Sequence, residues 1–192
     1  MKPWTLYSHL YKNFRLHWPF VWLLNREKAN LSALIAGLPS QNWTILDIGS
    51  GVGHSLNLIQ GQKLLIGLDF NKNMAKSAAQ EGTPMIVADA TRLPIKAGSI
   101  SLFQAIGLSE YLKNLDTLFD EITYAGKTQP CFHLLFTSSP FSVFSLMRKL
   151  TGHRIYMRNA DMVTKIAESK GFQLVGTTEM FSQDAFLFRK NG

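Results

Sequence analysis

One glycine-rich segment constrains the fold of this chain more than any other part of the sequence. Residues 45–54 read ILDIGSGVGH, which predicts a buried strand, a tight turn and the first turn of a helix. Gly49, Gly51 and Gly53 permit a turn that Cβ atoms would block, and they let a ligand approach the backbone closely. The start of a helix also presents backbone N–H groups to an electron-rich ligand group. The segment therefore predicts a strand–turn–helix unit with a ligand site at the turn.

Two details of this segment narrow the class of ligand. The third glycine, Gly53, comes one residue earlier than in the dinucleotide pattern Gly-x-Gly-x-x-Gly, and His54 takes the place of that glycine. Asp47 stands just before the turn and suits a ligand that carries positive charge. A tight turn without any ligand is the structural alternative.

Two more acidic residues end the next two expected strands. Asp69 lies 20 residues after Gly49, where a strand-end carboxylate can accept both hydroxyls of a ribose. Asp89 ends the third expected strand, where it can accept from an exocyclic amine of adenine. The alternatives are that Asp69 caps the helix expected at 71–80 and that Asp89 caps a short turn. Acidic ends on three consecutive strands favour a ligand site.

The remaining pattern alternates between apolar, β-rich runs and amphipathic segments. Expected strands cover residues 43–48, 64–69, 85–88, 100–106, 131–137, 173–178 and 185–189. Expected helices lie near residues 53–59, 71–80, 111–124 and 160–170, and Gly171 is placed to end the last helix. This alternation predicts an α/β fold, with a Rossmann-like, mostly parallel, seven-stranded sheet and helices on both faces.

Two segments lie outside this alternation. Residues 3–37 have a helical pattern with many aromatic side chains, and Pro19 is expected to break it. Residues 138–159 form a long connection with an apolar first part and a basic second part, and long connections often carry function. We expect one domain over residues 1–192, with an N-terminal helical lid at 1–40 and a core at 41–192.

Composition and charge bound the remaining options. Cys131 is the single cysteine among 192 residues, so an intrachain disulfide and a cysteine-based zinc cluster are excluded, and we expect no metal. No run reaches the ~18 apolar residues that span a bilayer, and we expect a cytoplasmic protein. The first 40 residues carry five basic and one acidic residue, and residues 141–192 carry eight and four. These basic ends leave nucleic acid, anionic lipid, an anionic substrate or ordinary solubility open.

Three motifs together resemble those of class I S-adenosylmethionine-dependent methyltransferases, in the form common to small-molecule and quinone or lipid methyltransferases. Residues 46–53 (LDIGSGVG) are similar to the first motif, 67–74 (GLDFNKNM) to the second and 88–94 (ADATRLP) to the third. Residues 99–103 align with the fourth strand, where this chain has Ile100-Ser101 in place of the family's usual Phe-Asp. The resemblance covers about residues 40–190 and implies S-adenosyl-L-methionine as the cofactor, while it says little about the acceptor.

The resemblance also implies roles for individual residues. The backbone of 49–51 would pass against the methionine part of the cofactor, Asp47 would favour its amino group, and Asp69 would hold the ribose hydroxyls. Ser50 and Gly53 are the other implied cofactor contacts of the turn. Phe70 and Met74 would lie near the adenine, Asp89 and Ala90 at the adenine edge, and Ile106 and Gly107 on the methionine side.

On the acceptor side the candidates are Glu110, Tyr111, His133 and His153. Methyl transfer is an in-line displacement that alignment and water exclusion can accelerate, so a general base is needed only where the acceptor must lose a proton. We expect His133 to be a hydrogen-bonded core residue. Glu110 and Tyr111 could instead form the first turn of a helix, and His153 could be a surface residue.

The sequence therefore predicts methyl transfer to a small, lipophilic or aromatic acceptor, beneath a lid formed by the N-terminal helices and residues 138–159. Aromatic residues beside lysine and arginine also suit peripheral contact with a membrane surface. An RNA methyltransferase and a non-catalytic S-adenosylmethionine-binding partner protein are the alternatives. No Asn-Pro-Pro-Tyr-like motif follows the fourth strand and no second cysteine exists, which disfavours nucleobase amines and cysteine-based pyrimidine chemistry. The oligomeric state stays open.

Overall fold

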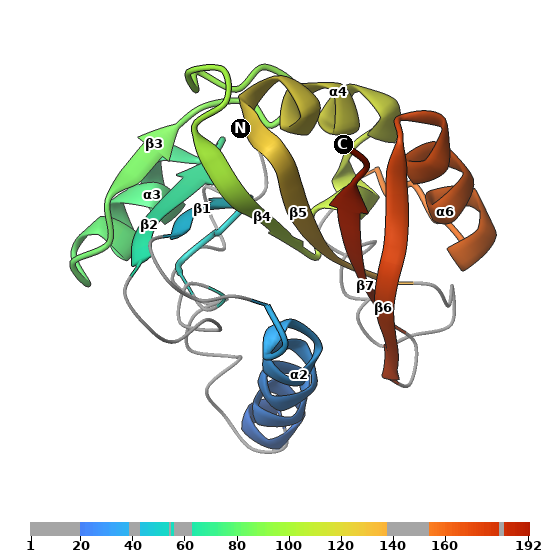
Figure 1. Ribbon diagram of the computed structural model, residues 1–192. Coiled ribbons are helices and arrows are strands. Elements are labelled where there is room, and N and C mark those ends of the chain that lie inside the picture. The colour runs from blue at the N-terminus through green and yellow to red at the C-terminus, as the bar shows by residue number, and fades with distance from the viewer. Residues whose placement is uncertain (1–19, 39–42, 54, 56–62, 138–153, 181–182) are drawn as a thin grey trace.

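The computed structural model describes residues 20–38, 43–53, 55, 63–137, 154–180 and 183–192. Within these residues seven strands form one sheet in the order β3-β2-β1-β4-β5-β7-β6 (Figure 1). The strands are β1 (Trp43–Ile48), β2 (Lys63–Asp69), β3 (Met85–Val87), β4 (Ile100–Ile106), β5 (Gly126–Thr137), β6 (Phe172–Met180) and β7 (Gln183–Lys190). The first five strands pair in parallel, and β7 pairs antiparallel with both β5 and β6. The predicted mostly parallel α/β sheet is confirmed.

The described residues also form four α-helices and one short 3-10 helix. They are α2 (Phe20–Ile35), α3 (Lys72–Ala79), η1 (Ser109–Tyr111), α4 (Leu115–Ala125) and α6 (Ala160–Ser169). An asparagine caps the N-terminus of three of them, because its side-chain oxygen accepts from a backbone N–H of the first turn. The caps are Asn71 before α3, Asn114 before α4 and Asn159 before α6.

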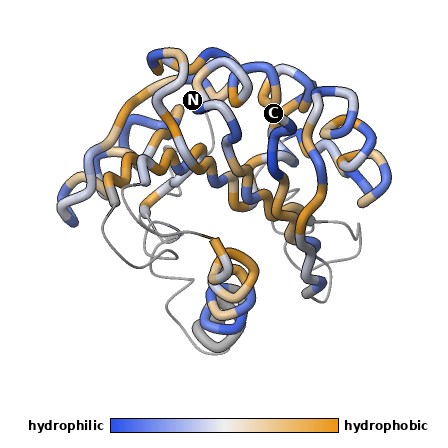
Figure 2. The backbone as a smooth tube through the Cα atoms, viewed as in Figure 1, coloured by the Kyte–Doolittle hydropathy of each residue, from blue (hydrophilic) through white to orange (hydrophobic). Residues whose placement is uncertain are grey.

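Helices cover both faces of the sheet, as predicted. On one face, residues of α4 and α6 such as Phe119 and Val163 join a large buried cluster with Phe132 of β5 and Phe188 of β7. On the other face, α2 packs Leu31, Ile35 and the half-buried Leu34 over a second cluster. Figure 2 shows hydrophobic residues along the central strands, between these layers. The sheet is therefore buried from both sides, and its edges remain to carry polar groups.

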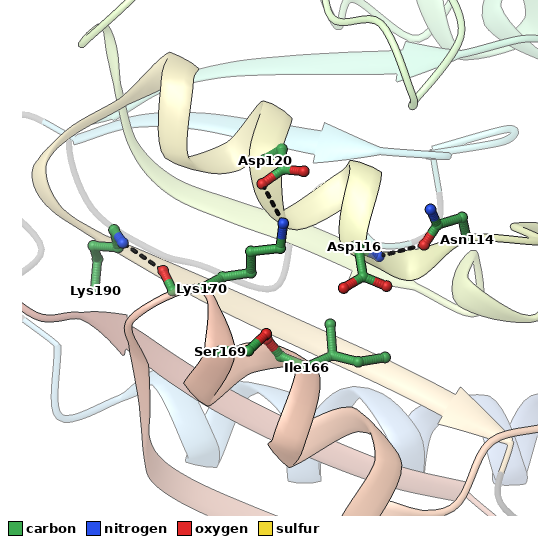
Figure 3. Close-up of polar contacts among 7 residues, drawn as sticks. All are labelled: Asn114, Asp116, Asp120, Ile166, Ser169, Lys170 and Lys190. Carbon is green, nitrogen blue, oxygen red and sulfur yellow. Dashed lines mark hydrogen bonds and ion pairs between the residues drawn. The ribbon is translucent and has the colours of Figure 1, made fainter.

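Polar contacts fix α4, α6 and the end of β7 to one another (Figure 3). Lys170, directly after α6, donates to Asp120 of α4 at 2.7 Å, and Lys190 donates to the carbonyl of Lys170. Gly171 follows with a φ of +76°, the left-handed conformation that ends a helix readily. Its predicted role as the end of the last helix is confirmed.

Most element boundaries lie within two residues of the predicted ones, and two differ by more. The fourth helix was expected at 111–124, but Tyr111 belongs to η1 and α4 begins only after its N-cap, Asn114. The two helices are separate because the backbone of Leu112 is extended. The fifth strand was expected to begin at residue 131 but begins at Gly126, which is also the C-cap of α4. A Cβ on Gly126 would lie 2.5 Å from Pro130 Cγ, so only glycine lets the helix pass directly into this strand.

The expected helix near 53–59 and the first parts of the two long segments lie largely outside the described residues. The helical pattern after Pro19 is confirmed, since α2 begins at Phe20. Of the described helices, none is long and apolar enough to cross a bilayer.

Candidate functional site

The glycine turn after β1 is held against the end of β2. The N–H groups of Gly49 and Ser50 both donate to the carbonyl of Leu68, at 2.7 and 3.1 Å. Gly49, Gly51 and Gly53 have φ values of +73°, +58° and +91°, so all three adopt the conformation that favours glycine. A Cβ on Gly49 would lie 2.9 Å from Leu108 Cδ1, whereas a Cβ on Gly51 would enter open space. The turn thus packs against the segment after β4 and leaves open room above Gly51.

Asp69, the last residue of β2, connects this turn to the start of α3. Its Oδ2 accepts from the N–H of Gly51 at 2.8 Å and its Oδ1 from the N–H of Asn71 at 2.7 Å. Burial raises the pKa of the Asp69 carboxyl, and these two backbone hydrogen bonds oppose that rise. Asn71, rather than Asp69, caps α3. Since each carboxylate oxygen has two lone pairs, Asp69 keeps acceptor capacity for further hydroxyl donors.

Asp47 in β1 is a fully buried acidic residue directly beneath the turn. Its Oδ2 accepts from Ser55 Oγ at 2.5 Å, while Oδ1 is buried without a hydrogen-bond partner. Burial raises the pKa of this carboxyl to about 7; the Ser55 hydrogen bond lowers it, and the charge of Asp69 adds to the rise. A cationic group next to Oδ1 would stabilise the charged carboxylate and offset the free-energy cost of burying it.

Asp89 and its neighbours follow β3, the strand next to β2. Asp89 Oδ1 accepts from both the N–H and the hydroxyl of Thr91, at 2.8 Å each, so this carboxyl does cap a short turn. The side chain is exposed, which leaves Oδ2 accessible to another donor. Ala90 is buried. The turn-capping reading and the ligand reading of Asp89 are therefore compatible.

Phe70 and Met74 differ sharply in burial although both lie near the end of β2. Met74, in the first turn of α3, is 4% exposed, whereas Phe70 is 56% exposed. An exposed phenylalanine beside two strand-end carboxylates offers a flat apolar surface to a ligand.

The end of β4 completes this edge of the sheet. Ile106 is half-buried, and Gly107 turns the chain at a φ of +70° while its N–H donates to the carbonyl of Leu135 at 2.9 Å. Because β3, β2, β1 and β4 are neighbouring parallel strands, their carboxyl ends lie along one edge. The structure therefore brings every described cofactor candidate to this edge. They are Asp47, Gly49, Ser50, Gly51, Gly53, Asp69, Phe70, Met74, Asp89, Ala90, Ile106 and Gly107.

Arg158 organises the chain that follows this edge, although the sequence analysis did not single it out. Its guanidinium donates to the carbonyls of Ser109 and Leu112 at 2.6 Å each, and to those of Tyr156 and Lys113 at 3.2 and 3.3 Å. Burial lowers the pKa of Arg158, and the nearby charge of Glu110 opposes this shift. One side chain thus ties the end of the 138–159 connection to the turn after β4.

The acceptor-side candidates have different environments. Glu110 is 1% exposed within η1, and its carbonyl accepts from the N–H of Tyr156 at 2.8 Å. Tyr111 is half-buried beside it. His133 is buried in β5 as expected, but the structure gives neither ring nitrogen the expected hydrogen-bond partner. His153 lies outside the described residues, as does His54.

Ser55 and Arg158 are the contacts that sequence patterns could not have identified. Ser55 is one of several polar residues near the turn, and Arg158 is one of four basic residues in its connection. Among the described residues, no group of three or more His, Cys, Asp or Glu side chains is placed to hold a metal ion.

The residues of this edge lie within a segment that matches a known protein family. Residues 46–128 match the family described as "Methyltransferase domain". None of the curated proteins matches the chain in sequence.

Several solved structures share the fold. Magnesium protoporphyrin IX methyltransferase from Synechocystis PCC 6803, with bound SAH, is similar with a TM-score of 0.71 and 16% identity over 90% of this chain and 84% of that chain. An S-adenosylmethionine-dependent methyltransferase from Thermotoga maritima is similar with a TM-score of 0.73 and 12% identity, over 98% of this chain and 100% of that chain. Another from Mesorhizobium loti is similar with a TM-score of 0.69 and 16% identity, over 82% of this chain and 96% of that chain.

The domain match begins one residue before Asp47 and ends within β5, so it contains the glycine turn, all three acidic strand ends and the turn after β4. The structural neighbours extend the same fold across the rest of the sheet. Residues 46–128 therefore match a methyltransferase domain, and the chain has the fold of the S-adenosylmethionine-dependent methyltransferases compared above.

Proposed function

We propose that this protein uses S-adenosyl-L-methionine to methylate a small, lipophilic or aromatic acceptor. The observation that carries the proposal is the edge formed by the glycine turn and the strand-end carboxylates. The unpartnered Oδ1 of buried Asp47 suits a cationic amino group, and the open space above Gly51 suits a ligand close to the backbone. When bound, this cofactor supplies an activated methyl group on a sulfonium centre.

In this proposal, each residue of the edge binds a different part of the cofactor. Asp47 holds the amino group, Asp69 accepts from the ribose hydroxyls, and Asp89 Oδ2 accepts from the adenine amine. The exposed ring of Phe70 lies against the adenine, with Met74 beneath. Ile106 and Gly107 border the methionine side.

The acceptor is proposed from the segment next to this edge. The described end of the 138–159 connection carries three consecutive half-buried side chains with large apolar parts, Ile155, Tyr156 and Met157. The backbone of Tyr156 is bonded to Glu110 in the turn after β4. A similar structure, from Synechocystis, is named as a porphyrin methyltransferase, which supports a flat, lipophilic acceptor as one candidate class. Tyr111 and Glu110, in the same turn, are the groups proposed to orient such an acceptor.

Two measurements test the proposal. Calorimetric titration with S-adenosylmethionine should show binding to the wild-type protein, and absence of binding would refute the assigned site. Formation of S-adenosylhomocysteine is then followed with panels of phenolic, quinone and porphyrin acceptors, with and without anionic lipid vesicles. Turnover that increases in the presence of vesicles would support the membrane-surface form of the proposal. Tyr111→Phe should lower turnover more than it lowers cofactor affinity if Tyr111 orients the acceptor.

An RNA acceptor is the second candidate, and the formal net charge of +7 favours it. It requires RNA binding that weakens steeply with salt. Methylation of bulk RNA, with none of the small acceptors, would replace the leading proposal. Cofactor binding without turnover of either class would instead indicate a partner protein that only binds the cofactor.

A further inference from the structure

Three buried polar side chains lie next to one another on the sheet face that α2 covers. Asp47 of β1 is the register partner of Gln104 in β4, and Gln104 is the register partner of His133 in β5. All three residues are 0% exposed. Neighbouring strands lie ~4.8 Å apart, and residues in register point to the same face. The three side chains therefore form one row, which we call the polar row.

The polar row is bounded on both sides by residues without polar side chains. Asp47 is also the register partner of Gly67 in β2, and His133 is the partner of Leu187 in β7. α2 covers this face with Leu31, Leu34 and Ile35. Most described side chains on this face are therefore apolar, and Ser55 is the polar side chain that bonds Asp47.

Five side-chain atoms in this row are buried without a hydrogen-bond partner. They are Asp47 Oδ1, both polar atoms of the Gln104 amide and both ring nitrogens of His133. The described part of the chain has no other buried side-chain atom in this state. Buried polar atoms in native proteins are nearly always paired. A carboxylate accepts, while an amide and a neutral imidazole each donate and accept, so the three groups complement one another.

We propose that Gln104 and His133 are positioning residues for the Asp47 carboxylate, which they hold through a hydrogen-bonded row across β1, β4 and β5. Gln104 Nε2 donates to one lone pair of Asp47 Oδ1, which leaves the other lone pair for the cofactor's amino group. A ring N–H of His133 donates to Gln104 Oε1. The terminal torsions of these side chains have broad minima, so the pairing needs side-chain rotation and no movement of the strands. Ser55 already holds the other carboxylate oxygen.

This arrangement agrees with the electrostatics of the row. Burial lowers the pKa of His133 to about 3, so at neutral pH the imidazole is neutral and has one donor and one acceptor nitrogen. Asp69 is the charged group, among the described residues, that acts on Asp47, and it raises the pKa of that carboxyl. Gln104 and Ser55 are neutral donors that favour the carboxylate form. The inference rests on the proposed function, because the carboxylate they hold is the one assigned to the cofactor's amino group.

The test follows the ionisation of Asp47 in the protein without cofactor, by carbon-13 NMR of labelled aspartate carboxyl groups. Gln104→Met removes the donor at nearly constant volume and should raise the Asp47 midpoint by about one pH unit. His133→Leu should move it in the same direction by less, and His133→Asn, which keeps an N–H, should restore it. Leu187 of β7 is the apolar register partner of His133. Leu187→Met is therefore the matched control and should leave the Asp47 midpoint unchanged.

An unchanged Asp47 midpoint in both Gln104→Met and His133→Leu would overturn the inference. His133→Leu carries the same test if Gln104→Met does not fold. Calorimetric titration with S-adenosylmethionine, run on the same samples, separates this inference from the proposed function. A wild type that fails to bind while the midpoints move refutes the function alone. Binding by the wild type with unmoved midpoints refutes the row alone.

Discussion

The backbone N–H of Gly51 donates a hydrogen bond to Asp69 Oδ2 across 2.8 Å. This contact joins the glycine turn after β1 to the last residue of β2, across a separation of 18 residues in the chain. The carboxylate proposed to hold the ribose is thus also a structural support of the turn. Changes at either residue should therefore alter both stability and cofactor affinity.

Asp69→Ala should weaken S-adenosylmethionine binding by about 10- to 100-fold, because each charged hydrogen bond contributes about 1.5–3 kcal/mol. Calorimetric titration measures this loss. Asp120→Ala is the control, since it removes an exposed carboxylate whose pair with Lys170 is worth at most about 1 kcal/mol. Equal affinity of Asp69→Ala and wild type would contradict the ribose assignment.

Gly51→Ala and Gly82→Ala form a matched pair. Both glycines have positive φ, +58° and +89°, and an added Cβ would meet no atom at either position. Each substitution should therefore cost about 1–2 kcal/mol of folding free energy, measured by urea unfolding. Only Gly51→Ala should also weaken cofactor binding, by at least about tenfold, because its methyl group enters the space assigned to the ligand. A similar loss of affinity in Gly82→Ala would show that the effect is not local.

Cofactor affinity should depend on pH through Asp47. Burial raises the pKa of this carboxyl to about 7, so below pH 7 the free protein is mostly protonated there. Since a cationic amino group binds the carboxylate form, the dissociation constant should rise about tenfold per pH unit below 7. Below pH 7 the heat of binding should also depend on the buffer, because the Asp47 carboxyl releases its proton to the buffer when the cofactor binds. An affinity that is flat between pH 5.5 and 8 would contradict this role of Asp47.

Asp47→Asn should stabilise the protein without cofactor at pH 8. The folded-state pKa of Asp47 lies above the ordinary value of 3.8, so the native state binds more protons than the unfolded state between about pH 4 and 7. Stability from this group is therefore present at low pH and is lost as pH rises toward 7. A neutral amide should recover up to about 4 kcal/mol at pH 8. The same variant should bind S-adenosylmethionine more weakly. A lower free energy of unfolding at pH 8 than that of the wild type would contradict the raised pKa of Asp47.

Arg158→Lys should destabilise the turn after β4 despite keeping the positive charge. A lysine ammonium cannot reach the several carbonyls that the guanidinium contacts, including those of Ser109 and Leu112 at 2.6 Å, and each buried carbonyl left unpaired costs about 1–3 kcal/mol. Urea unfolding gives the total, and hydrogen exchange of residues 109–113 should quicken. Arg154→Lys, at an exposed arginine, should change stability by at most about 0.5 kcal/mol.

Local patterns predicted much of the sheet. β1 and β4 were predicted with their observed bounds because each is a short apolar run, the first followed by a glycine turn and the second preceded by a Gly-Ser pair. The three acidic strand ends were identified because a strand, a turn and a helix leave separate signatures along the chain. The start of the fifth strand was missed because its first residues include Gly126 and Pro130, which are rare within strands. Pro130 lies where the β4–β5 register shifts, so its missing N–H costs no ladder hydrogen bond.

The sequence by itself determined the class of fold, the turn and the residues that end the strands, since these depend on periodicity, on glycine conformation and on spacing within short segments. Tertiary structure alone decided which strands are neighbours. Asp47, Gln104 and His133 are 57 and 29 residues apart in succession, and they meet only because β4 pairs between β1 and β5. Arg158 likewise reaches Ser109 across 49 residues. Contacts of this kind arise from the burial of whole strands and helices against one another, and no local pattern encodes them.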